Sequence, residues 1–85
     1  MSNEFSFGYN NLITTQIKSI TTFYDGSNYI ISVRQLMNGW VTELHAIHST
    51  GVSEIVTNTF DTEKEAEENQ QWVLQHLEDI LVQEI

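Results

Sequence analysis

Apolar and polar residues alternate on both sides of the dipeptide Asn38-Gly39. The flanking stretches, Tyr29–Met37 and Trp40–His48, are rich in β-branched and aromatic residues, which favour strands. Asn-Gly suits the two positive-φ positions of a type I′ turn, a common two-residue connection between antiparallel strands. The pattern therefore predicts a β-hairpin centred on Asn38-Gly39, with Arg34 directly opposite Glu43 as a favourable cross-strand pair.

Counting outward from this turn assigns each side chain of the hairpin to one of two faces, because successive strand residues point to opposite sides. The first face receives Tyr29, Ile31, Val33, Gln35 and Met37, together with Trp40, Thr42, Leu44, Ala46 and His48. The second face receives Ile30, Ser32, Arg34 and Leu36, together with Val41, Glu43, His45 and Ile47. A slip of the strand register by one residue would destroy this division of the side chains between the two faces.

A further strand is expected on each side of the hairpin. Residues 13–24 are rich in isoleucine, threonine and aromatic residues and end at turn-forming residues 25–28, so they predict a preceding strand. Residues 53–60 follow another turn at 49–52 and predict a short final strand.

The register of that final strand has two alternatives. A two-residue turn places Ile55 on the first face, whereas a three-residue turn places Val56 and Phe60 there. The pattern alone does not choose between them, since each alternative buries apolar side chains.

A helix is predicted for residues 62–85. Thr62 followed by Glu65 has the spacing of a capping box, and acids crowd the first turns, where they complement the helix dipole. At 100° per residue, the apolar side chains fall within an arc of about 140°. They are Ala66, Val73, Leu74, Leu77, Ile80, Leu81 and Ile85. This stripe is suited to cover one face of the sheet.

Strands followed by a helix predict an α+β fold. We expect a small antiparallel sheet of three or four strands, a β-meander, packed on one long C-terminal α-helix. With 85 residues, the chain has material for a single domain with one thin core. Within it we expect a loose arm over 1–10, the meander over 12–60 and the helix over 62–85.

The chain is strongly acidic, with 12 Asp+Glu against 3 Lys+Arg and a formal net charge of −9. Eight of these acids lie in residues 61–85. Phosphate binding needs clustered Lys and Arg, so we expect no direct binding to DNA, RNA or an anionic membrane. The sequence has no Cys, no apolar run of the roughly 20 residues that a membrane span needs, and no secretory signal among its first ten residues. We therefore expect a cytoplasmic protein, acting in the host cytoplasm if it is viral.

Motifs for catalysis or cofactor binding are missing from the sequence. It has no Cys nucleophile and no glycine-rich loop that could cradle a phosphate. His45 and His48 point to opposite faces of a strand, and Glu43 with His45 makes only two ligands. We therefore predict no enzyme activity, no cofactor and no metal site.

The strongest candidate for a binding surface lies on the predicted helix. Trp72 falls about 80° outside the apolar arc, in line with acidic residues, and Trp is enriched at interface hot spots. The candidate partner-binding residues are Asp61, Glu63, Glu65, Glu67, Glu68, Trp72, His76 and Asp79. Two plainer explanations stand beside this one: Trp72 covers the N-terminal arm or a sheet edge, and the acids serve only solubility.

The second sheet face is also unusually apolar. It carries Ile30, Leu36, Val41 and Ile47, although a single helix covers only one face of a sheet. An apolar patch on a small protein often marks an interface, so this face is a candidate surface for a homodimer.

Two functions follow from these surfaces. The first is a non-enzymatic protein–protein interaction protein, in its most specific form an inhibitor whose closely spaced carboxylates mimic nucleic acid and occupy the basic site of a DNA- or RNA-processing or defence enzyme. In size, acidity and lack of catalytic motifs, the chain resembles the small proteins by which phages block host defences, anti-CRISPR and anti-restriction proteins among them. The alternative is a homo-oligomeric binding or scaffold module that acts through Trp72 and the second sheet face.

Overall fold

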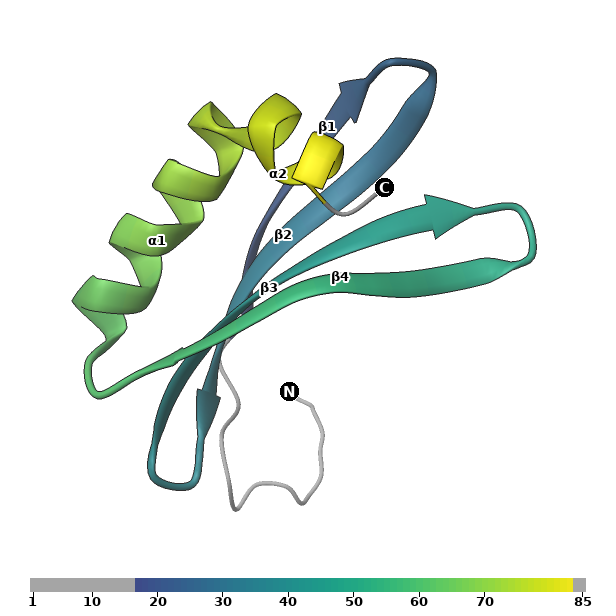
Figure 1. Cartoon of the computed structure of the whole chain (residues 1–85). Coiled ribbons are helices and arrows are strands. Elements are labelled where there is room, and N and C mark those ends of the chain that lie inside the picture. The colour runs from purple at the N-terminus through teal and green to yellow at the C-terminus, as the bar shows by residue number, and fades with distance from the viewer. Residues whose placement is uncertain (1–16, 84–85) are drawn as a thin grey trace.

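The computed structural model describes residues 17–83 of the chain as a four-stranded antiparallel sheet followed by two helices. The strands are β1 (Ile17–Tyr24), β2 (Ser27–Leu36), β3 (Gly39–His48) and β4 (Gly51–Phe60), and the helices are α1 (Glu63–Gln75) and α2 (Leu77–Gln83). The strands pair in chain order, so the predicted α+β fold and meander are confirmed (Figure 1). The expected arm at 1–10 and the first residues of the predicted first strand lie outside the described residues.

The type I′ turn occurs at the first hairpin instead of the second. Asp25 and Gly26 have φ values of 49° and 83°, the positive values that both central positions of a type I′ turn require. In the second hairpin Leu36 pairs with Gly39, so the turn residues are Met37 and Asn38. The predicted turn at Asn38-Gly39 is therefore wrong by one position.

This displacement moves the β2–β3 register by two residues, which keeps every side chain on its predicted face. Arg34 now lies opposite Val41, and Glu43 lies opposite Ser32, so the predicted direct pair of Arg34 and Glu43 is wrong. The two charges still meet diagonally. Arg34 donates hydrogen bonds of 3.0 and 3.3 Å to the Glu43 carboxylate.

A β-bulge in β4 combines both predicted registers of that strand. Leu44 pairs with Val56, whereas the next residue of β3, His45, pairs with Glu54. Ile55 is therefore the extra residue, and its insertion reverses the side-chain alternation of the strand. As a result, Ile55 and Val56 both pack against the core.

The C-terminal helical segment is two helices instead of the single long helix that was predicted. The predicted capping box is present: Glu65 N donates to Thr62 Oγ1 and Thr62 N donates to Glu65 Oε1, both at 3.2 Å. α1 then ends at Gln75, and the C-cap residue His76 has φ −112° and ψ 23°.

The break turns the chain between α1 and α2. As a result, the apolar residues of α2 pack near the far ends of the two hairpins. Leu77 joins the core, and Ile80 and Leu81 pack against it. Figure 1 shows α2 on the same side of the sheet as α1, near the ends where the hairpins diverge.

The core lies between the helices and the first sheet face, at Ile31, Leu44, Val73 and Leu77. Two buried polar contacts fix α1 on the sheet. Thr42 Oγ1 donates to the Ala66 carbonyl at 2.7 Å. The side chain of Gln70 donates to the carbonyls of Ile31 and Lys18 at 2.8 and 3.1 Å.

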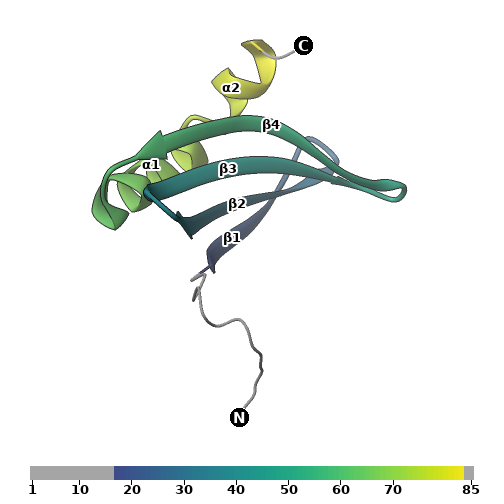
Figure 2. The same cartoon turned by 90° about the horizontal axis from the view of Figure 1, so that it is seen from below.

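The opposite face of the sheet is not covered by any helix or strand of residues 17–83. In Figure 2 the four strands lie side by side as one layer, and the smallest dimension of the molecule is 16 Å. The fold is thus a thin two-layer structure.

Candidate partner-binding surface

The acidic residues of α1 are divided between two flanks of the helix. Glu63 and Glu67 lie about 150° around the axis from Glu65 and Glu68 on average. Lys18 of β1 lies 2.6 Å from Glu63 and also forms an ion pair with Glu67. Hydrogen bonds to Glu63 and then Glu67 raise the pKa of Lys18 to about 12. The β1 flank of the helix is therefore partly neutralised from within the chain.

The other flank of α1 forms a shallow, open groove against the end of β4. It has a volume of about 460 Å³ and is lined by Phe60, Glu65, Glu68, Asn69 and Trp72. We call it the Trp72 groove. Among the described residues, no Lys or Arg forms an ion pair with Glu65 or Glu68, so the carboxylates on this flank are not neutralised by a described base.

The indole of Trp72 is held in place although its side chain is half exposed. Its exposed fraction is 50%, and its ring stacks on that of His76 with centroids 4.3 Å apart and planes 19° apart. His76 Nδ1 lies 2.8 Å from the Trp72 carbonyl oxygen, so the tautomer with hydrogen on Nδ1 donates this bond. The predicted neighbours Trp72, His76, Glu65 and Glu68 are thus brought together on one side of α1.

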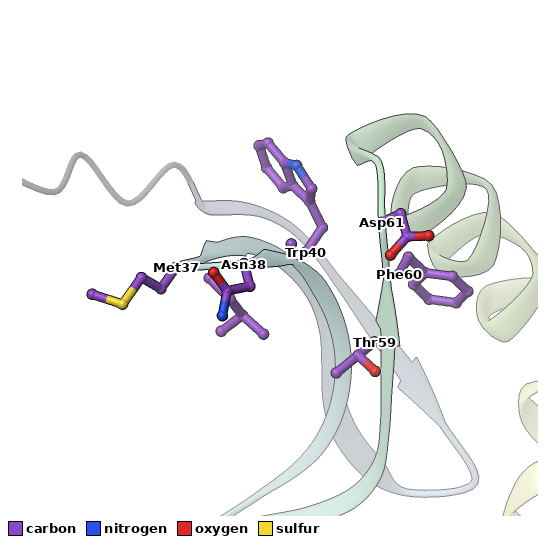
Figure 3. A pocket seen from close by; sticks show the side chains of 8 residues that line it. Met37, Asn38, Trp40, Thr59, Phe60 and Asp61 are labelled. Atoms are coloured by element: carbon purple, nitrogen blue, oxygen red, sulfur yellow. The ribbon is translucent and has the colours of Figure 1, made fainter.

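A second pocket adjoins the groove across Phe60, which lines both. It has a volume of about 320 Å³ and lies between the β2–β3 turn and the end of β4, with Trp40, Thr59 and Asp61 among its lining residues. Figure 3 shows the indole of Trp40 and the carboxylate of Asp61 on opposite sides of this pocket, with Met37 pointing away from both. Aromatic rings and carboxylates therefore alternate along this edge of the molecule.

Sequence reasoning missed Trp40 and Phe60 as members of this surface. Strand alternation assigned Trp40 to the helix-covered face, and it assigned Phe60 there only in the register with a three-residue turn. Their pairing across β3 and β4, at the edge where α1 begins, leaves them only partly buried. Asp79 lies in α2 and lines neither of the two pockets.

The predicted apolar residues of the second sheet face do lie together on the uncovered side. Val41 is nevertheless buried, with 2% exposed, so the accessible apolar surface there comes from Ile47, which is 37% exposed, and from Ile30 and Leu36, which are intermediate. Further exposed apolar residues lie on the same face at Ile17, Phe23 and Val52.

The two strand histidines lie on different faces, as the alternation predicts. His48 Nε2 lies 3.1 Å from Ser53 Oγ. His45 lies with Glu43 and Glu54 on the uncovered face, and one ligand atom from each of the three lies within 4.8 Å of the others. Glu54 is the third possible ligand that the sequence pattern missed, because the bulge determines which residue of β4 lies beside His45.

Neither a scan against protein-family models nor searches of curated proteins and of solved structures found a match for this chain. Within residues 17–83, neither helix has the length and apolar character needed to cross a membrane. What the protein does is therefore inferred from the chemistry of its own surfaces.

Proposed function

We propose that this protein is a small, non-enzymatic binding protein that presents the Trp72 groove to a basic site on a protein partner. The observation that carries the proposal is the half-exposed indole of Trp72, stacked on His76 beside Glu65 and Glu68. An exposed aromatic ring is an unfavourable feature of a helix whose apolar stripe is already buried, and a binding role accounts for it.

The groove combines the groups that recognise an arginine or lysine side chain. A cation over an indole face gains about 0.5–2 kcal/mol, depending on desolvation. A guanidinium can also form paired hydrogen bonds with a carboxylate, which Glu65 and Glu68 would supply. One face of the indole contacts the imidazole of His76, which leaves the other face for the partner.

In its more specific form, this function is mimicry of nucleic acid, as in an inhibitor of phage type. A flat aromatic ring beside carboxylates offers a partner the two features of a nucleotide, a ring to stack on and a negative charge to pair with. A basic site in a DNA- or RNA-processing or defence enzyme recognises both. The net charge of −9 would steer the encounter with such a site.

The test is a pull-down with the full chain as bait, followed by titration of the captured partner. Binding is carried out at low salt and elution in salt steps, with competing DNA in a parallel sample. We expect Trp72→Ala to weaken binding by about 30-fold, the size of a hot-spot truncation of about 2 kcal/mol. Affinity should fall as salt rises, because surface charges are screened.

A matched pair of double variants separates the groove from net charge. Glu65→Gln/Glu68→Gln and Glu63→Gln/Glu67→Gln each remove two charges from α1, but only the first pair lines the groove. Glutamine at 65 keeps the capping box. We expect the first variant to weaken binding at least tenfold more than the second. Equal effects would exclude the groove, and a partner indifferent to salt and DNA would exclude mimicry.

The uncovered sheet face supports a second candidate function, a homo-oligomeric binding or scaffold module. If this face joins two copies, the chain should sediment as a dimer. Ile47→Lys should then return it to a monomer, because it places a charge in the apolar interface. Val82→Lys makes an equally drastic change at an exposed site on α2, and this variant should still sediment as a dimer. A monomeric wild type at micromolar concentration would exclude this function.

A further inference from the structure

Three possible metal ligands meet on the uncovered face of the sheet, away from the Trp72 groove. Glu43 and His45 are separated by one residue on β3, so their side chains project from the same face. Glu54 of β4 is paired with His45 across the strands. One ligand atom from each residue lies within 4.8 Å of the other two.

The β-bulge creates this meeting. If the pairing of Leu44 with Val56 continued without the bulge, the residue beside His45 would be Ile55. The actual pairing of His45 with Glu54 turns Ile55 into the core and brings a carboxylate to the imidazole. Bulges are common where a sheet re-aims a side chain for function.

We propose that Glu43, His45 and Glu54 bind one Zn²⁺ ion, with its remaining coordination position open to water. Carboxylate oxygen and imidazole nitrogen are ordinary zinc ligands at about 2.0–2.2 Å. At those distances, tetrahedral ligand atoms lie about 3.4 Å apart. Because Glu54 is exposed, a rotation of its side chain closes the remaining gap.

The surroundings of the three residues hold both carboxylates in place and leave a small excess of negative charge. Glu43 is 13% exposed at its side chain and accepts two hydrogen bonds from Arg34. Thr57 Oγ1 donates to the Glu54 carboxylate, an outer contact of the kind that orients metal ligands. Two carboxylates and one described base, Arg34, leave one excess negative charge, which attracts a cation.

The experiment is a calorimetric titration of the metal-free full chain with zinc chloride. We expect one ion per chain. His45→Gln and Glu54→Gln should each weaken binding at least tenfold, since each removes one of three protein ligands. His48→Gln and His76→Gln are matched controls, because both histidines lie elsewhere in the fold, and they should bind zinc as the wild type does.

A second measurement reports on the site directly. Zinc should shift the imidazole ¹⁵N resonances of His45 and leave those of His48 and His76 in place. Glu54 is exposed, so its substitution leaves the core intact and keeps the test valid even if His45→Gln does not fold. The proposal is overturned if the wild type binds no zinc, or if either histidine control loses as much affinity as His45→Gln. Neither outcome bears on the Trp72 groove, which uses none of the three proposed ligands.

Discussion

Leu44→Ala is expected to lower the free energy of unfolding by about 3–4 kcal/mol. Leu44 is 1% exposed and belongs to the buried cluster with Ile31, Val73 and Leu77. Truncation removes its transfer free energy and leaves a cavity that a close-packed core refills only in part. A domain of this length is stable by about 4–13 kcal/mol, so one such cavity removes a large share of the total.

Urea unfolding followed by the fluorescence of the two tryptophans measures this loss, with the slope of the transition as a check on two-state behaviour. Leu36→Ala is the matched control, because it deletes the same atoms at the partly exposed end of β2. We expect that variant to lose about 1 kcal/mol. Equal losses would mean that the layer between helix and sheet does not dominate the stability.

The faces of the strands could be predicted from the sequence even though the turn position could not. Alternation has a period of two, so the displacement of the β2–β3 register by two residues left every side chain on its predicted side. The turn itself depended on backbone dihedrals that Asn38-Gly39 favours but does not impose. Asp25-Gly26 carries the two positive φ values instead.

Features that depend on contacts between distant parts of the chain could not be predicted from the pattern of apolar and polar residues. The bulge at Ile55 and the helix break at His76 both improve the packing of residues far apart in sequence, such as Ile55 and Leu81. Gln70 is a buried polar residue within the predicted apolar stripe. Its hydrogen-bond partners are strand carbonyls 39 and 52 residues away in sequence, so helical periodicity does not predict its burial.

Part of the candidate site was predictable from helical periodicity. Trp72 and its neighbours Glu65, Glu68 and His76 follow from 100° per residue, and the structure brings them together. The ion pairs of Lys18 with Glu63 and Glu67 could not be predicted from periodicity, because they join β1 to α1. Lys18 and Glu67 are 49 residues apart in sequence.

Gly39→Ala is expected to lower the free energy of unfolding by about 2–4 kcal/mol, through the backbone alone. Gly39 has φ +158°, and a Cβ there would lie 2.6 Å from the Phe60 carbonyl oxygen. An unfavourable dihedral costs about 1–3 kcal/mol, and forced overpacking costs a similar amount. The obstructing atom is itself backbone, held next to the pair of Trp40 and Phe60, so no rotation of a side chain relieves the clash.

Gly51→Ala separates the two causes. Gly51 has a similar φ of +148° but no atom within 4 Å of the added Cβ, so this variant bears only the dihedral cost. In parallel urea titrations, we expect Gly39→Ala to be less stable than Gly51→Ala by at least 1 kcal/mol. Equal stability would mean that β4 yields freely at Phe60. Because Phe60 lines the Trp72 groove and the pocket of Trp40, the close approach at Gly39 also fixes the edge of the proposed binding surface. A folded Gly39→Ala protein should therefore bind the partner more weakly than Gly51→Ala does.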